Sequence, residues 1–258
     1  MSLSLRVATV FVVLSLLAQV PLLAAVFDSL PGVTFGAHLA LLDLVKGVTV
    51  ALNVLRSMPT PPQSWTQRFH TLPAVVVIRV AGGSLQAVML AQSWAWLHSP
   101  ITLPSIVLSW ALVFCAPSLV RTLLMRSNDV GLALTWANCL AAAHTITTSA
   151  IDVVASSSSP ALRQSLIAPI VIALVAACSG RVVGDALAWT AKPGAPVAWT
   201  PLLRTVAVAA LYVALVRYGV LAADSRRAVV AAALVSFSLG DCWTSGKERD
   251  AAAKRKKQ

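Results

Sequence analysis

The chain has 258 residues, of which 58% are apolar and only 11% are charged, and its mean hydropathy is +0.81. Soluble domains are about 45–50% apolar and about 25% charged, so a water-soluble fold of this size could not bury so many apolar side chains. The apolar residues form continuous blocks of about 20, enough for a helix to cross a bilayer, without the alternation of a membrane barrel. Composition therefore predicts an all-α, polytopic membrane protein.

Seven apolar blocks are the predicted spans, and they lie at residues 36–55, 72–97, 104–120, 130–154, 165–189, 201–222 and 228–243. A further apolar stretch over residues 7–27 fits two alternatives, a cleaved signal peptide or an extra span. The expected organisation is an N-terminal apolar segment over 1–35, a seven-span domain over 36–243 and a basic tail over 244–258.

The formal net charge of +11 follows membrane topology and not a nucleic-acid-binding face. Six of the 20 basic residues lie in the last twelve positions, and most others flank the apolar blocks. The loops on the side of the tail hold 12 basic residues, whereas the opposite loops hold three. Because positively charged loops stay in the cytosol, the C-terminus is predicted to be cytosolic. No nucleic-acid partner is expected.

A short internal repeat links spans two and five. Residues 79–85 read R-V-A-G-G-S-L and residues 181–187 read R-V-V-G-D-A-L, so four identities recur 102 residues apart. Three span-to-span steps separate the copies, an odd number, which gives them opposite orientations in the membrane. The sequence therefore predicts a seven-helix bundle that contains two halves of opposite orientation. Such repeats place a substrate or ion path at their interface.

Charged residues inside the predicted spans cost about 2.5–3.5 kcal/mol each on insertion scales, so each needs a partner or a function. Arg181 and Asp185 lie four residues apart and are expected to pair on one helical face. Asp43 and Lys46, three apart, offer the same pairing, whereas Arg79 needs either a partner on another helix or water. These groups either hold helices together or line a polar path that attracts cations through its carboxylates.

The glycines of spans two and five also have two explanations. They let helices pack closely, or they bend the spans and free carbonyl groups toward a path. Pro117 and Pro169 lie inside predicted spans and are expected to kink them. The candidate pore and bend residues are Asp43, Arg79, Gly82, Gly83, Gly180, Arg181, Gly184 and Asp185.

Motifs of enzymes and metal sites are missing from the sequence. No nucleotide-binding, zinc-protease or hydrolase signature occurs, and the four histidines show no metal-ligand spacing. The four cysteines lie in apolar segments without C-x-x-C spacing. We therefore expect no enzyme activity, no metal and no cofactor.

Several local motifs occur in the order of one known family. Asp43 precedes the span-two glycines at that family's spacing, and Gly82-Gly83-Ser84 stands where the family has a glycine triplet. W-A-L-V-F-C-A-P at 110–117 resembles W-x-x-x-F-x-C-P with the cysteine shifted by one. Arg181 with Gly184 stands at the place of the family's W-A-R-G-x-G-G motif. Further along the chain, Lys192-Pro193 matches the family's K-P, and Pro201 with Arg204 resembles its proline followed by a basic residue. Over about residues 40–245 the sequence thus resembles the trimeric intracellular cation channel family.

This resemblance implies a seven-helix bundle built from two inverted three-helix repeats plus a final helix, and a homotrimer in which each subunit holds its own pore. It implies passage of potassium, sodium and other monovalent cations across the endoplasmic or sarcoplasmic reticulum, as counter-ion flow during calcium release. The family's span-four K-E-V-x-R motif, associated with phosphoinositide binding, aligns with residues 144–148. Both basic positions are lost there, which leaves lipid binding through His144 and Thr148 in doubt. A secondary transporter is the alternative, because inverted repeats suit carriers equally well.

The basic tail carries the expectation for localisation. Lys254 and Lys256 lie five and three positions from the C-terminus, the spacing of a di-lysine retrieval signal to the endoplasmic reticulum. The alternative is a basic cluster that binds anionic lipids at the membrane surface. Both alternatives place the tail in the cytosol, and the expected location is the endoplasmic reticulum or another internal membrane.

Overall fold

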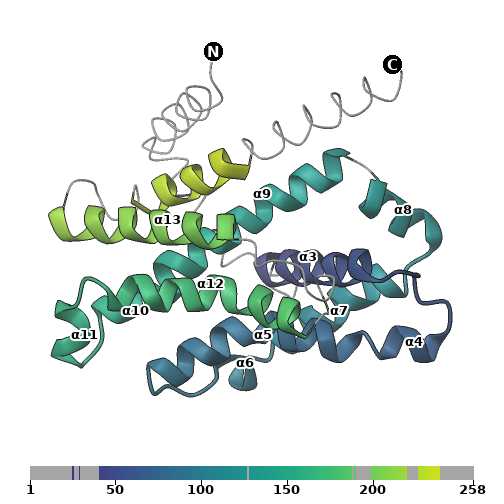
Figure 1. Cartoon of the computed structure of the whole chain (residues 1–258), viewed down its shortest axis with the longest axis horizontal. Helices are drawn as coiled ribbons and strands as arrows, with labels where there is room; N and C mark the ends of the chain where they lie inside the picture. The colour runs from purple at the N-terminus through teal and green to yellow at the C-terminus, as the bar shows by residue number, and fades with distance from the viewer. Residues whose placement is uncertain are drawn as a thin grey trace, which may run out of the picture.

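The computed structural model describes residues 41–126, 128–187, 189, 199–219 and 226–238, together with Ala25 and Ser29. Every regular element within these residues is a helix, which confirms the predicted all-α fold (Figure 1). The long helices are α3 (Leu41–Ser57), α5 (Leu72–Met89), α7 (Thr102–Phe114), α9 (Asn128–His144), α12 (Ala168–Ala186) and α13 (Trp199–Tyr218). A further helix covers 226–238. The shorter elements are α4 (Trp65–Phe69), α6 (Ala95–His98), α8 (Ser118–Arg126), the π-helical η2 (Thr145–Ile151), α10 (Asp152–Ala155) and α11 (Pro160–Gln164).

Helix α5 is shorter than the predicted second span. It begins with Pro73 in its first turn, where a proline costs no backbone hydrogen bond. It ends at Met89 because Ala91 adopts a left-handed conformation, with φ of 51°, and the amide of Gln92 closes the end on the carbonyl of Ala87. The segment predicted to continue the span to residue 97 instead turns and forms α6.

The two prolines expected to kink spans lie at helix ends, so that prediction is wrong. Pro117 lies between the end of α7 at Phe114 and the start of α8 at Ser118. Pro169 is in the first turn of α12. A proline lacks the N–H that a helix interior requires, whereas the first turn of a helix has no intrahelical acceptor for that N–H.

The described helices pack around two apolar cores. The first core joins α3, α5 and α7 through buried side chains such as Leu52, Val75 and Phe114. The second joins η2, α10, α12, α13 and the helix over 226–238 through residues such as Ile146 and Val208. We call α3, α5 and α7 the first half, and α9 with η2 and α10, α12 and α13 the second half.

The halves meet most extensively where α5 packs against α12, side by side in Figure 1. A Cβ atom added to Gly82 would collide with the backbone carbonyl of Ala176, and one added to Gly180 would collide with the carbonyl of Ile78. These contacts follow opposite directions along the two helices, so α5 and α12 are antiparallel. For Gly82 and Gly180 the structure shows close packing, and both helices stay α-helical through their glycines. The expected bends stay a prediction.

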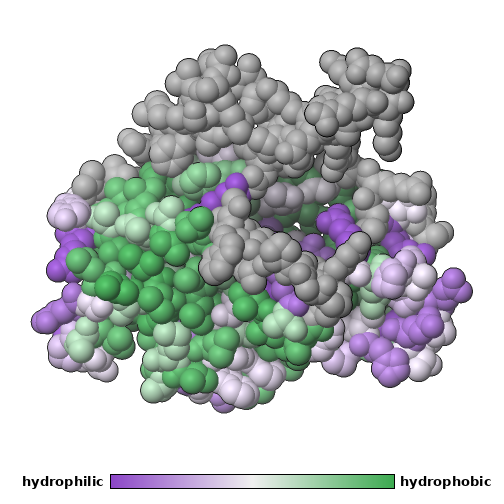
Figure 2. All heavy atoms as spheres, viewed as in Figure 1, coloured by the Kyte–Doolittle hydropathy of each residue, from purple (hydrophilic) through white to green (hydrophobic). Residues whose placement is uncertain are grey.

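The surface is unusually apolar for a chain of this size. Large apolar side chains are exposed on several helices, among them Val88 on α5 at 62% and Leu203 on α13 at 65%. In Figure 2 apolar side chains cover much of the left and lower part of the visible face, and polar ones gather at its left and right ends. Within the described residues, the segments Trp65–Met89 and Ala168–Ala186 are long and apolar enough to cross a membrane, and Thr102–Phe114 is a shorter apolar helix.

The glycine contacts predict opposite effects for neighbouring substitutions in α5. Gly82→Ala should lower the free energy of unfolding by about 1–3 kcal/mol, because the new methyl group meets a backbone carbonyl that cannot move alone. Gly180→Ala should do the same from the other helix. Thermal unfolding of the purified protein in detergent, followed by size-exclusion chromatography, measures the change.

Gly83→Ala is the matched control, because no atom lies within 4 Å of its added Cβ. This substitution should be neutral or stabilising by up to about 1 kcal/mol, since alanine favours a helix over glycine. Equal melting temperatures for Gly82→Ala and Gly83→Ala would contradict the close approach of the two helices.

Candidate functional site

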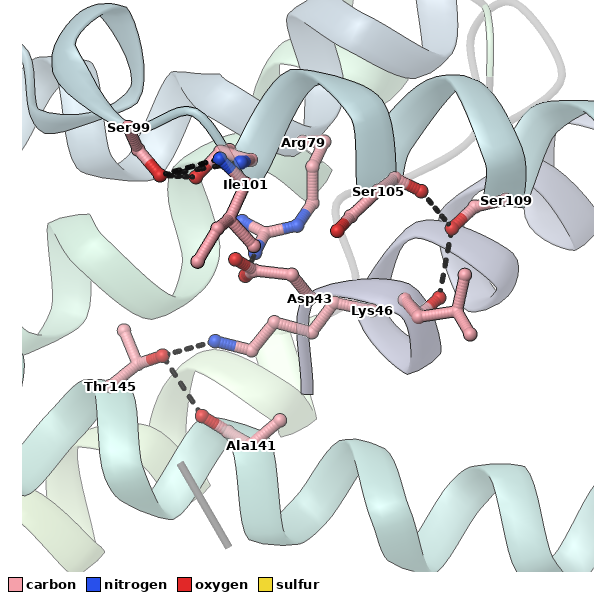
Figure 3. A network of polar contacts seen from close by, with 11 residues as sticks. Asp43, Lys46, Arg79, Ser99, Ile101, Ser105, Ser109, Ala141 and Thr145 are labelled. Atoms are coloured by element: carbon pink, nitrogen blue, oxygen red, sulfur yellow. Dashed lines mark hydrogen bonds and ion pairs between the residues drawn. The ribbon is translucent and has the colours of Figure 1, made fainter. Parts of the chain in front are cut away.

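A charged pair joins two helices of the first half. Arg79 on α5 donates from Nη2 to Oδ1 of Asp43 on α3 (Figure 3). The two side chains are only 17% and 27% exposed, so the pair is largely shielded from the surroundings. The prediction that Arg79 takes its partner from another helix is confirmed. Shielded pairs of this kind fix the relative rotation of two helices, because each charge is costly without the other.

Lys46 lies one turn after Asp43 on α3 and reaches the second half. Its ammonium group donates to Oγ1 of Thr145, the first residue of η2, as Figure 3 shows. Thr145 in turn donates to the carbonyl of Ala141 at 2.9 Å. The sequence offered Asp43 as the partner of Lys46, whereas the structure gives Asp43 to Arg79 and Lys46 to a hydroxyl group. Lys46 therefore links the two halves.

Serine side chains and a glycine position α3 against α7. Ser109 is fully buried and donates to the carbonyl of Ser105 at 2.6 Å or of Leu44 at 3.0 Å. A Cβ atom at Gly47 would collide with the side chain of Ser109, so α3 approaches α7 only because residue 47 is glycine. This contact lies one residue from Lys46 and sets the height of Asp43 and Lys46 along the bundle.

The π-helical segment η2 is a feature that the sequence reasoning missed. The hydroxyl groups of Thr145 and Thr147 donate to the carbonyls four residues before them, which competes with regular helical hydrogen bonding. Gln86 on α5 donates to the carbonyl of Ser149 inside the same segment. Wide π turns within helices occur frequently at functional sites. The available signal was the T-I-T-T-S run, which concentrates residues of this kind.

The second half holds its arginine differently. Arg181 and Asp185 pair along α12 with 3.7 Å between Nε and Oδ2, which confirms the predicted contact. The side chain of Arg181 is 55% exposed, far more than that of Arg79. In the sequence, Arg181 lies 102 residues after Arg79, which is the offset of the short repeat. Arg181 takes its carboxylate from its own helix, whereas Arg79 takes it from α3.

Asp152 forms a second polar cluster, which sequence reasoning did not assemble. Tyr212 on α13 donates to Oδ1 of Asp152 at 3.0 Å, and Arg227 donates to Oδ2 at 3.1 Å. The three residues come from α10, α13 and the helix over 226–238, so this cluster ties the last helix to the second half. Its members lie 60 and 75 residues from Asp152, beyond any local sequence pattern.

The remaining predicted residues divide by position. Gly184 is buried and Gly83 is exposed. His144 ends α9, and Oγ1 of Thr148 is buried without a hydrogen-bond partner in the described part of the chain. Lipid binding at these two residues stays a prediction. Lys254 and Lys256 lie outside the described residues. Among those described, no group of three or more His, Cys, Asp or Glu side chains could hold a metal ion.

Comparison with known proteins finds similarity to this chain in the fold and not in the sequence. No protein-family model matches the sequence, and no curated protein matches it by sequence. Two solved structures of a trimeric intracellular cation channel from C. elegans match the fold. The structure with bound Ca²⁺ aligns with a TM-score of 0.65 and 14% identity, over 85% of this chain and 96% of that chain. The structure without Ca²⁺ aligns with a TM-score of 0.58 and 17% identity, over 78% and 88%.

The chain has the fold of a trimeric intracellular cation channel. At 14–17% identity the likeness establishes the architecture, and the chemistry of this chain depends on its own side chains. Within the channel fold, the Asp43–Arg79 pair, Lys46 with Thr145, and Gln86 with Ser149 all lie where the two halves meet or next to that boundary. We call these six residues the central polar cluster.

The different exposure of the two ion pairs predicts different costs of breaking them. Asp43→Asn should lower the free energy of unfolding by about 2–3 kcal/mol, because it leaves the shielded guanidinium of Arg79 without its counter-charge. Asp185→Asn, the matched substitution in the exposed pair, should cost less than about 1 kcal/mol. Adding Arg79→Gln to Asp43→Asn should recover part of the loss. Thermal unfolding in detergent compares the four proteins, and an Asp43→Asn variant no weaker than Asp185→Asn would refute the shielded pair.

Proposed function

We propose that this protein is a cation channel whose ion path runs between the two halves of each subunit. The observation that carries the proposal is the shared fold, which extends over 96% of a trimeric intracellular cation channel structure. The central polar cluster supports it, because charged groups in the interior of an apolar helical bundle are costly and usually mark an ion or substrate route.

The apolar exterior supports a membrane location. Exposed Val88, Leu203 and Ile167, at 62%, 65% and 70%, would be costly in water but favourable against lipid chains. The polar ends of the face in Figure 2 lie at the short helices α11 on the left and α4 on the right of Figure 1, and the apolar part lies between them, as expected for a bundle whose middle faces lipid. Two segments have the length and composition of spans within the described residues.

The position of the path follows from the inverted repeat that we infer for the two halves. Ile78 and Gly180, which touch across α5 and α12, lie 102 residues apart, the offset of the sequence repeat. A twofold axis relating the halves would therefore pass through this contact. Paths in proteins with inverted repeats lie at the repeat interface near the midplane of the bilayer. In this proposal Asp43 and Asp185 attract cations, and Arg79 and Arg181 offset part of their charge.

The finer features of the proposal come from the resemblance and from the names of the similar structures. We propose a homotrimer with one path per subunit, permeable to potassium and sodium, that supplies counter-ion flow across an internal membrane during calcium release. Gly82, Gly83 and Gly184 would bend spans two and five where they flank the path, in conformations that conduct. A secondary transporter remains the competing function for an inverted repeat.

Recording from the purified protein in planar bilayers tests the function. Under asymmetric KCl we expect unitary current steps with a reversal potential toward that of potassium, because the carboxylates draw cations into the path. Asp185→Asn should lower the unitary conductance while the protein elutes as the wild type does, since one attracting charge is lost. Flux without unitary steps would indicate a carrier and overturn the channel proposal.

The localisation proposal rests on the tail. We expect a tagged full-length protein to reside in the endoplasmic reticulum and a Lys254→Ser, Lys256→Ser variant to leave it, because the di-lysine spacing is lost. Fluorescence microscopy against an organelle marker measures the change. Arg249→Ser with Lys247→Ser removes the same charge outside that spacing and serves as the control. If both double variants leave the reticulum equally, tail charge and not the signal determines the location.

A further inference from the structure

We propose that Lys46 is the valence filter of the ion path, a fixed positive charge at its centre that admits monovalent cations and hinders divalent ones. The inference deepens the proposed function and rests on it. It assigns to one lysine the preference for singly charged ions.

The repeat offset places Lys46 near the middle of the path. Lys46 contacts Thr145, and the two residues lie 99 positions apart, close to the repeat offset of 102. A twofold axis that exchanges residue i with residue i + 102 makes Thr145 equivalent to residue 43 and Lys46 equivalent to residue 148. The axis therefore crosses α3 midway between residues 43 and 46, and it crosses η2 midway between residues 145 and 148. These points lie between residues 44 and 45 and between residues 146 and 147. Lys46 is one and a half residues from that point, or about 2 Å along a helix that rises 1.5 Å per residue.

Arg79 lies at nearly the same height. It follows Ile78, whose contact with Gly180 joins residues separated by the full offset. One residue along α5 corresponds to about 1.5 Å. The contact between α5 and α12 and the contact between α3 and η2 therefore independently place Arg79 and Lys46 close to the height of the twofold axis. In an inverted repeat this level is the midplane of the membrane, where the protein environment strengthens electrostatic interactions most.

Lys46 is the charged residue of this cluster that forms no ion pair within the described part of the chain. Arg79 pairs with Asp43, and Arg181 pairs with Asp185. The partner of Lys46 in the described part of the chain is the neutral hydroxyl of Thr145. The three ionised groups of the cluster, Asp43, Lys46 and Arg79, together carry a net charge of +1. Lys46 is thus the source of the excess.

A fixed charge of this kind discriminates by valence. The repulsion between Lys46 and a passing cation is proportional to the charge of the cation. If the repulsion lowers the permeability to potassium by about tenfold, it lowers the permeability to barium by about one hundredfold. The reason is that permeability depends exponentially on the repulsion energy, and this energy doubles with the charge of the ion. The carboxylates still draw cations to the cluster, so a monovalent ion passes and a divalent ion meets a much higher barrier.

Lys46→Gln tests the charge while an amide donor for Thr145 remains. In planar bilayers containing the full-length protein, we expect the potassium conductance and the barium-to-potassium permeability ratio each to rise about tenfold. Lys46→Arg, which restores the charge, should return the ratio to within about twofold of the wild type. Arg163→Gln removes a positive charge from exposed α11, far from the cluster, and should leave both values within about twofold.

The outcomes separate this inference from the proposed function. Unitary currents in the wild type with an unchanged permeability ratio in Lys46→Gln overturn the valence filter and leave the channel standing. Absence of any current in the wild type overturns the proposed function itself. If Lys46→Gln does not elute as the wild type does, Lys46→Met provides the same neutralisation. An equal rise in Arg163→Gln would also overturn the inference, because it would trace the effect to surface charge.

Discussion

The backbones of α5 and α12 touch because Gly82 and Gly180 have no side chains, and the arrangement of the two halves depends on this contact. Larger residues would separate the helices and move the side chains that extend from them. Arg79 and Arg181 each lie next to a residue of the contact, so the crossing sets the height of both guanidinium groups. A lipid-facing bundle gains little hydrophobic energy from helix association, and close backbone packing is the main attraction that remains.

The two halves compensate the charge of their arginines in different ways. In the first half Asp43 on a neighbouring helix neutralises Arg79, which ties α3 to α5. In the second half Arg181 pairs with Asp185 on its own helix. Neither pair joins the two halves. That link comes from Lys46, whose ammonium group donates to Thr145 on η2.

The likeness to channel structures at 14–17% identity has a physical basis in this composition. Most positions need only be apolar, and exchanges among Leu, Val, Ile and Ala on a lipid-facing surface cost little. The fold restricts few positions: those where backbones approach, such as Gly47 against Ser109, and those where a charge needs a partner, such as Asp152 with Tyr212 and Arg227. A shared architecture therefore survives with little sequence in common.

The sequence alone determined the helical class, the approximate positions of the helices, the offset of 102 and the Arg181–Asp185 pair. All of these depend on local periodicity or composition, because residues four apart on a helix are neighbours in any fold. Only the tertiary structure decided that Arg79 pairs with Asp43, that Lys46 crosses to Thr145, and that Gln86 binds η2. Those contacts join residues 36, 99 and 63 positions apart, and they depend on how each helix is rotated against its neighbours. Apolar blocks without a strong polar face leave that rotation undefined until the helices pack.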